Sequence, residues 1–398
     1  MKRYPAYDPP EYVDWKPDPE LVRQFAETPR RDPARAQLVD ALDRDFLLTL
    51  YAGLIRTRLI DVTLKRWVRT GVISKAWLGT GEEAATVGPV YALTRGHDYV
   101  APMIRNSGAC NEMGMPVADI LRGYLGTADG PSRGRDGHYG DFARHVLPPI
   151  SHVGDMVAVV TGIALAGKLR GKGKGEGGKA GTGGSSPFPP SPFPVVMTWI
   201  GDGSTKAGVS HEGFNFAAVQ RVPAIFIVQN NQVALGTRLG QHHLPENFEE
   251  LPASYGMWGA SFDGNNVLDA WAAAKLAVDR CRAGEGPAML VANTFRMGGH
   301  ATHDEREARA TFPAEWFARW GQRDPIGLFE EYLKAGNGER GRGNEKTLRE
   351  IESAVEDEIA NAETEALASR EKSVPEGASA LKGVYADGGR AVGRSGGR

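Results

Sequence analysis

The sequence predicts an α/β fold with a central, mostly parallel sheet and helices on both of its faces. Two short apolar runs, residues 194–200 (PVVMTWI) and 223–228 (PAIFIV), are rich in β-branched and aromatic residues, which is typical of buried parallel strands. Residues 210–221 between them read as a helix, and a strand, a crossover helix and a second strand form one right-handed parallel unit. Residues 288–294 (AMLVANT) are a further strand-like run.

An N-terminal arm precedes the main domain. Residues 1–33 are rich in proline and charge, and we expect this arm to wrap a partner or to remain loose. A helical pattern begins near Ala34, and residues 46–55 supply its apolar stripe. We therefore predict the main domain over residues 34–340. Within it, residues 171–194 are of low complexity and too poor in core-forming residues to fold alone, which predicts a disordered surface insertion.

The C-terminal part predicts a helical segment, residues 341–374, followed by a mostly disordered Gly-Arg-rich tail, residues 375–398. The helical segment has a narrow apolar stripe and a charged outer face. We expect it to dock on the domain or on a neighbouring subunit. The stripe consists of Leu348, Ile351, Val355, Ile359 and Ala362.

Polar residues follow the first two strand-like runs. Gly201, Asp202 and Gly203 come after the first run, and Asn231 ends the segment after the second. Because open α/β sheets bind ligands beyond the carboxyl ends of their strands, we expect Asp202 and Asn231 to lie in neighbouring loops. Their oxygens are hard ligands suited to Mg²⁺ or Ca²⁺, and the glycines allow close approach of a phosphate. Either motif alone is typical of a surface turn; together they predict a metal-bound diphosphate.

These motifs resemble a known family. GDG followed by NN roughly thirty residues later is similar to the thiamine diphosphate motif, and residues 211–231 (HEGFNFAAVQRVPAIFIVQNN) resemble the α subunit of the E1 component of 2-oxo acid dehydrogenase complexes. The resemblance implies the thiamine diphosphate-binding fold, with Mg²⁺ held by the side chains of Asp202 and Asn231 and by the carbonyl of Val233. It also implies that Gly201, Gly203 and Ser204 surround the cofactor.

The resemblance extends upstream. Residues 79–85 (GTGEEAA) are similar to the family's GxEA helix, and residues 99–105 (YVAPMIR) to a segment that ends in Tyr-Arg, although Ile104 stands in place of the tyrosine. This implies that Arg105 binds the diphosphate, since a guanidinium can grip phosphate oxygens in a bidentate fork. Ser151 and Val153 match positions that cradle the aminopyrimidine.

A histidine in a glycine-containing loop is the second chemical centre. Residues 295–304 read FRMGGHATHD, and glycines before a histidine predict a mobile loop that can bring the imidazole against a bound ligand. Histidine suits proton handling because its pKa lies near neutrality. The resemblance implies that His300 lies near the diphosphate and assists acyl transfer. Many mitochondrial members are phosphorylated on a serine where this chain has Ala301, so that mode of inactivation cannot operate at this position.

The resemblance also implies a partner chain. The glutamate that activates thiamine belongs to the β subunit in two-chain E1 enzymes, and we expect 398 residues to hold only the diphosphate-binding half. We therefore expect an α2β2 heterotetramer that hands its acyl group to an E2 lipoyl acyltransferase.

Composition agrees with these expectations without adding a function. The net charge of −2 gives no electrostatic reason to expect nucleic-acid or membrane binding. Cys110 and Cys281 are too few for a disulfide framework, so we expect buried thiols. No apolar run has membrane-spanning length and the N-terminus does not resemble a secretory signal, which together predict a cytoplasmic protein.

The resemblance thus implies a thiamine-dependent 2-oxo acid dehydrogenase that is active only with a β subunit. With its acidic pair Asp304 and Glu305, the histidine loop resembles branched-chain members slightly more than pyruvate members, which slightly favours a branched-chain 2-oxo acid as the substrate. Two alternatives stay open: the α subunit of an acetoin dehydrogenase, and a non-catalytic protein that binds thiamine diphosphate.

Overall fold

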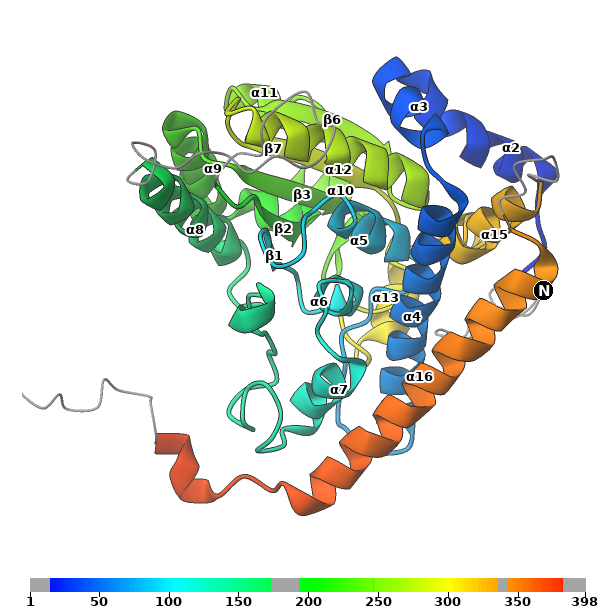
Figure 1. Cartoon of the computed structure of the whole chain (residues 1–398), viewed down its shortest axis with the longest axis vertical. Coiled ribbons are helices and arrows are strands. Elements are labelled where there is room, and N and C mark those ends of the chain that lie inside the picture. Colours follow the sequence, from blue (N-terminus) through cyan, green and yellow to red (C-terminus); the bar gives the residue numbers. More distant parts are fainter. Residues whose placement is uncertain (1–14, 173–192, 246, 336–342, 382–398) are drawn as a thin grey trace, which may run out of the picture.

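A five-stranded parallel sheet forms the centre of the protein (Figure 1). The computed structural model describes residues 15–172, 193–245, 247–335 and 343–381. Across the sheet the strands run in the order β1 (Tyr99–Ala101), β2 (Val196–Gly201), β3 (Ala224–Asn230), β7 (Ala288–Asn293) and β6 (Trp258–Asp263). All four neighbouring pairs are parallel. The predicted α/β class and the three predicted strands are confirmed.

Helices cover both faces of this sheet, because successive strand residues point to opposite sides. Ile225 and Ile227 of β3 belong to one buried apolar cluster, whereas Phe226 and Val228 belong to another. The cluster of Phe226 is completed by α8 and α9, and that of Ile225 by α4, α5 and α12. The bounds of these helices are Asp155–Lys172 for α8, Gly208–Gln220 for α9, Arg44–Arg69 for α4, Glu83–Val90 for α5 and Val267–Arg282 for α12.

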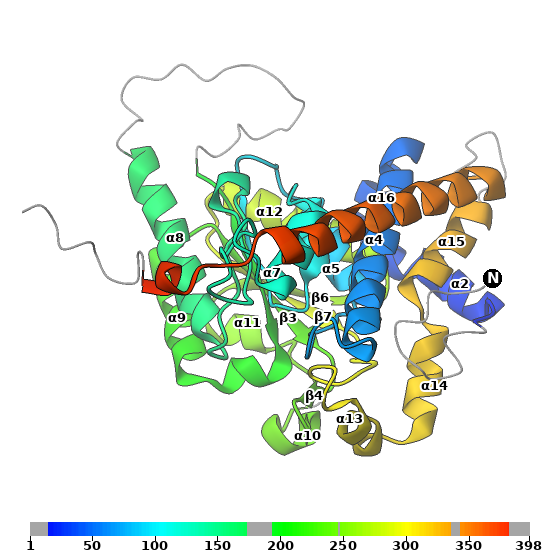
Figure 2. The ribbon, with the colours of Figure 1, turned by 90° about the horizontal axis from the view of Figure 1, so that it is seen from below.

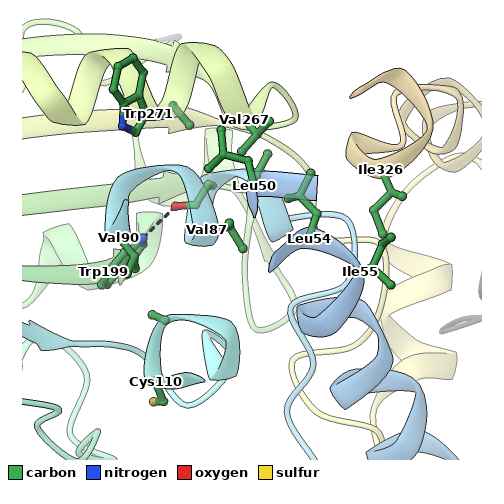
Figure 3. Close-up of a cluster of buried hydrophobic side chains, with 14 of the residues drawn as sticks. Leu50, Leu54, Ile55, Val87, Val90, Cys110, Trp199, Val267, Trp271 and Ile326 are labelled. Atoms are coloured by element: carbon green, nitrogen blue, oxygen red, sulfur yellow. Dashed lines mark hydrogen bonds between the residues drawn. The ribbon is translucent and has the colours of Figure 1, made fainter. Parts of the chain in front are cut away.

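The larger cluster joins helices that are far apart in the sequence (Figure 3). Leu50 and Leu54 of α4 lie close to Val87 of α5 and Val267 of α12. Trp199 of β2 is buried against α5, where its indole Nε1 donates to the Ala85 carbonyl at 2.8 Å. The residues that follow α4 and begin α5 are thereby held against the sheet.

The described part of the N-terminal arm, which we expected to wrap a partner or to remain loose, is folded against the chain's own domain. Helix α2 (Pro19–Glu27) is followed by η1 (Thr28–Arg31) and α3 (Pro33–Asp40), and α2 packs on α15 (Pro325–Ala335). Trp15 is buried and donates from its indole to the Gln322 carbonyl at 3.1 Å. Trp15 and Phe25 are the buried aromatic residues of this segment, and the proline-rich composition did not indicate that they would pack into a core. Residues 1–14 of the predicted arm lie outside the described residues.

The predicted C-terminal helix is α16 (Glu345–Lys372), which runs along α4 and α7 (Val117–Leu125) (Figure 2). Of its predicted stripe, Leu348, Val355, Ile359 and Ala362 are buried. Tyr51 of α4 donates from its hydroxyl to Glu352 at 2.7 Å. We expected this helix to dock on the domain or on a neighbouring subunit, and in the structure it docks on its own domain.

Shorter elements connect these parts. They are α6 (Ser107–Glu112), η2 (Phe142–Arg144), η3 (Asp202–Lys206), β4 (Val233–Ala234), β5 (Thr237–Arg238), α10 (Leu239–His242), α11 (Leu251–Ser254), α13 (Glu305–Thr311), α14 (Ala314–Gln322) and η4 (Gly377–Leu381). Both cysteines are buried free thiols, as predicted. No helix of the described residues is long and apolar enough to cross a membrane. Most of the predicted insertion, residues 173–192, and of the tail, residues 382–398, lies outside the described residues.

Candidate active site

The two sequence motifs meet at the carboxyl edge of the sheet. Gly201 at the end of β2 pairs in register with Gln229 of β3, so Asp202 and Asn231 follow neighbouring strands. Asp202 Oδ1 accepts from the Gly203 amide at 2.7 Å. Asp202 Oδ2 and Asn231 Oδ1 are buried and have no hydrogen-bond partner within the described residues. Since buried polar oxygens without partners are costly, this pair of open acceptors fits a cation.

The short strand β4 is held close to these residues. A Cβ on Gly203 would come within 2.4 Å of Ala234 Cβ, so only glycine allows this approach. The Val233 carbonyl, the third predicted metal ligand, accepts from Arg296 Nη1 at a long 3.4 Å. Arg296 is buried and also donates to the Leu235 carbonyl at 2.6 Å. Arg296 thereby fixes the β4 segment beside the site.

Electrostatics at Asp202 also favour a cation. Burial raises the pKa of Asp202 above its usual range, and this effect outweighs the opposing influence of the Gly203 amide and of the charges of His242, Arg296 and Arg105. His242 of α10 lies close enough to interact with this carboxylate, and both of its ring nitrogens are buried without a partner among the described residues. No group of three or more His, Cys, Asp or Glu in the described ranges is placed to hold a metal. Any cation here must therefore take amide, carbonyl or ligand oxygens as well.

Arg105 and His300 form a second pair. Arg105 is buried, and its Nη2 lies 3.1 Å from His300 Nδ1 and 3.3 Å from the His300 carbonyl. Burial, followed by the charge of Arg105, lowers the pKa of His300 to about 4. The imidazole is therefore neutral at pH 7. Because guanidinium can only donate, Nδ1 is the acceptor and the ring proton lies on Nε2.

The loop that carries His300 is anchored in this structure, whereas the sequence predicted a mobile loop. Asp304 accepts from the His300 amide at 3.1 Å and from the Ala301 amide at 2.8 Å. Thr302 and Ala76 are joined by two hydrogen bonds, from the Thr302 amide to the Ala76 carbonyl at 2.9 Å and from the Ala76 amide to Thr302 Oγ1 at 3.1 Å. These contacts hold the imidazole towards Arg105.

The two predicted pyrimidine-binding residues lie on an exposed loop that precedes α8. Ser151 Oγ is 3.1 Å from His138 Nε2, and the Val153 side chain is 63% exposed. The following Gly154 packs against Ser210 and Ser204, which places this loop beside the N-terminus of α9. The structure gives no contact from this loop to Asp202 or Arg105, so the roles of Ser151 and Val153 stay predictions.

Sequence reasoning missed two buried residues of this site. Glu82 accepts from Asn231 Nδ2 at 3.1 Å and lies 3.9 Å from Arg105 Nη1, and Arg296 holds β4. Glu82 lay within the GxEA-like segment and Arg296 within the histidine loop, but nothing local marks either residue as part of the site, since their partners are remote in the sequence.

Comparison with known proteins identifies relatives over most of the chain. Residues 53–373 match the family described as "Dehydrogenase E1 component". The 2-oxoisovalerate dehydrogenase subunit alpha of Bacillus subtilis (strain 168) is 31% identical over 358 residues, which are 88% of this chain and 98% of that protein. The pyruvate dehydrogenase E1 component subunit alpha of Rhizobium meliloti (strain 1021) is 31% identical over 283 residues, 71% of this chain and 74% of that protein.

A third relative is also a dehydrogenase α subunit. The 3-methyl-2-oxobutanoate dehydrogenase subunit alpha of Mycobacterium tuberculosis (strain ATCC 25618 / H37Rv) is 29% identical over 294 residues, 74% of this chain and 72% of that protein. The matched family covers most of the described fold, including the edge with Asp202, Asn231, Arg105 and His300. The chain therefore belongs to the dehydrogenase E1 component family, as an α subunit of the 2-oxo acid dehydrogenase type.

Proposed function

We propose that this chain binds thiamine diphosphate and Mg²⁺ and, with a β subunit, carries out the oxidative decarboxylation of a 2-oxo acid with acyl transfer to the lipoamide of an E2 component. The observation that supports this most strongly is the pair of buried, unpartnered oxygens of Asp202 and Asn231 at one sheet edge. When bound, the cofactor supplies the carbanion chemistry, and the polypeptide supplies binding and orientation.

The residues divide this work by their chemistry. Asp202, Asn231 and the Val233 carbonyl would hold Mg²⁺, whose remaining ligands are diphosphate oxygens and waters. Arg105 would bind the diphosphate. His300 is too weak a base to take up a proton at pH 7 in the unliganded chain, because its pKa is about 4. It is instead ready to donate a hydrogen bond from Nε2.

A partner chain is part of the proposal. Neighbouring α8 and α9 expose Val159, Leu169, Phe216 and Val219, and the Val153 loop lies beside them. Exposed apolar side chains on adjacent helices are candidates for a protein interface. We infer that the β subunit covers this face in an α2β2 assembly and brings the activating glutamate to the cofactor. The E2 lipoyl acyltransferase and a cytoplasmic location are carried over from the sequence predictions.

A branched-chain 2-oxo acid is the favoured substrate. The support is the identity to a 2-oxoisovalerate dehydrogenase subunit over nearly all of that protein, together with the acidic pair Asp304 and Glu305. Pyruvate is the competing substrate, because a pyruvate dehydrogenase subunit reaches the same identity over a shorter stretch.

The test is turnover by the chain coexpressed with a β subunit. Initial rates are measured on 3-methyl-2-oxobutanoate, pyruvate and acetoin with an artificial electron acceptor, with and without the β chain. We expect activity only with both chains and the highest kcat/KM on 3-methyl-2-oxobutanoate. Preference for acetoin would assign the chain to the alternative dehydrogenase. Cofactor binding without turnover of any substrate would support the non-catalytic alternative.

A further inference from the structure

Glu82 lies between Asn231, a predicted metal ligand, and Arg105, the predicted diphosphate ligand. It has no role in the function proposed above. Its side chain is 0% exposed. One carboxylate oxygen, Oε1, accepts from Asn231 Nδ2 at 3.1 Å and from Gln229 Nε2 at 3.1 Å. The other, Oε2, lies 3.9 Å from Arg105 Nη1 and has no hydrogen-bond partner within the described residues. Glu82 therefore contacts a predicted metal ligand and faces the predicted phosphate ligand.

The contact with Asn231 decides which end of its amide is offered to a cation. An amide has one accepting and one donating end, whereas an ionised carboxylate only accepts. Because Glu82 binds Nδ2, Asn231 Oδ1 is directed away from it and has no partner among the described residues. A flipped amide would present NH₂ to the cation, and NH₂ cannot coordinate it.

The orientation of the Gln229 side-chain amide is also fixed, so its Nε2 keeps donating to Glu82. Its Oε1 accepts from Asn106 Nδ2 at 3.0 Å, and the same Asn106 nitrogen donates to Thr86 Oγ1 at 2.6 Å. The Gln229 amide is thus fixed with its Nε2 towards Glu82. The chain of side-chain hydrogen bonds runs from α5 through β3 to the predicted metal ligand.

The backbone that carries Glu82 is itself fixed. Asp61 Oδ2 accepts from the Gly79 amide at 2.8 Å and from Thr80 Oγ1 at 3.0 Å, and Glu83 accepts from the Gly81 amide at 2.9 Å. A Cβ on Gly79 would lie 2.5 Å from the Arg105 carbonyl oxygen, so this loop packs directly on the Arg105 backbone. Glu82 and Arg105 are therefore held in one rigid arrangement.

We propose that Glu82 is a positioning residue that orients the Asn231 amide so that Oδ1 binds the cation of the diphosphate site. The proposal rests on the proposed thiamine diphosphate function. It assigns Glu82 no contact with substrate or cofactor. What matters is an acceptor at this place, so glutamine can substitute for Glu82 and an apolar side chain of the same size cannot.

The test compares Glu82→Met with Glu82→Gln in the α chain coexpressed with a β subunit. The readout is the Mg²⁺ concentration that half-saturates thiamine diphosphate binding, measured by calorimetry. We expect Glu82→Met to raise it at least about tenfold, as the loss of a residue behind a metal ligand typically does. Glu82→Gln should stay within about threefold, and the melting temperatures of the unliganded proteins verify that both variants fold.

A second experiment uses a background in which the Glu82 substitutions should lower the Mg²⁺ requirement instead of raising it. Asn231→Asp has no donating end, so its carboxylate would repel Glu82. In that background, Glu82→Met and Glu82→Gln should both lower the Mg²⁺ requirement. If Glu82→Met does not fold, the Gln variant carries the test, alone and with Asn231→Asp. A tenfold loss in Glu82→Gln alone, or losses that add in the double variants, would overturn the proposal. Failure of the wild type to bind Mg²⁺ and thiamine diphosphate would instead contradict the proposed function.

Discussion

Two buried polar regions lie beside each other in this protein and differ in how closely their charged side chains pair with one another. The Arg58 cluster comprises Arg58, Asp61, Glu83 and Asp324, and its arginine pairs with Glu83 and with Asp324 Oδ2, the latter at 3.1 Å. The diphosphate site comprises Glu82, Arg105, Asp202, Asn231 and His300. Except for His300, each residue of the diphosphate site has a buried side-chain atom without a hydrogen bond to the described residues. In the Arg58 cluster, Asp61 Oδ1 also lacks such a bond, but Glu83 and Asp324 both accept from Arg58.

The difference separates a structural from a ligand-binding use of buried polarity. In the Arg58 cluster, one guanidinium on α4 forms ion pairs with Glu83 of α5 and with Asp324 at the start of α15. In the diphosphate site, the open atoms include acceptors for a cation and an arginine donor for an anion, which together match a metal diphosphate. Mutations in the cluster should therefore reduce folding stability, and mutations in the site should reduce ligand binding and activity.

The largest expected effect is the loss of activity in Asp202→Ala. A metal ion bound to diphosphate contributes several kcal/mol to catalysis, so we expect kcat/KM of the αβ enzyme to fall on the order of 100-fold or more. The melting temperature of the unliganded protein should hold or rise, since a carboxylate whose burial outweighs its favourable contacts is removed. Asp357→Ala, on the exposed face of α16, is the control. Retained activity would remove Asp202 from the metal site.

Arg58→Leu should show the converse behaviour. Removing one partner of a buried ion pair leaves uncompensated charge, and we expect a loss of about 3–5 kcal/mol in the free energy of unfolding. Urea unfolding of the unliganded protein measures it. The matched control is Arg349→Leu, whose ion pair with Glu345 is exposed and should contribute less than about 1 kcal/mol. Equal losses in the two variants would show that the cluster does not stabilise the fold.

Arg105→Lys should affect binding with little effect on stability. Lysine keeps the charge but lacks the planar fork that binds two phosphate oxygens, so we expect thiamine diphosphate affinity to fall about tenfold. Calorimetry at saturating Mg²⁺ measures this affinity. A change confined to the melting temperature would place Arg105 with the structural cluster.

The last expected effect concerns the pH dependence of stability at Asp61. Burial, followed by the charge of Glu83, raises the pKa of Asp61 from 3.8 to about 8. Between these values the native state holds a proton that the unfolded state has released, so this carboxyl makes the free energy of unfolding fall as pH rises from about 4 to about 8. Asp61→Asn removes that component. The melting temperature of the variant, relative to that of the wild type, should therefore increase as the pH is raised from 5 to 8. A constant difference would contradict the raised pKa.

The sequence was sufficient where local pattern and chain topology act together. Asp202 and Asn231 were predictable because parallel strands deliver their carboxyl ends to one edge, and α16 because its stripe repeats at helical spacing. Glu82 was not, since its hydrogen bond reaches 149 positions along the chain to Asn231. The packing of the arm was not predictable either, because composition does not show that Trp15 and Phe25 become buried in contacts with residues some three hundred positions away.

The most direct test of the account is a Mg²⁺ titration by calorimetry in the presence of thiamine diphosphate, with the αβ protein as wild type and as Asp202→Asn. The account predicts Mg²⁺ binding to the wild type and at least about tenfold weaker binding to the variant, because an anionic ligand becomes a neutral one of the same shape. Asp357→Asn should bind Mg²⁺ as the wild type does. Equal affinity in wild type and Asp202→Asn would contradict the claim that the open oxygens at the sheet edge are metal ligands.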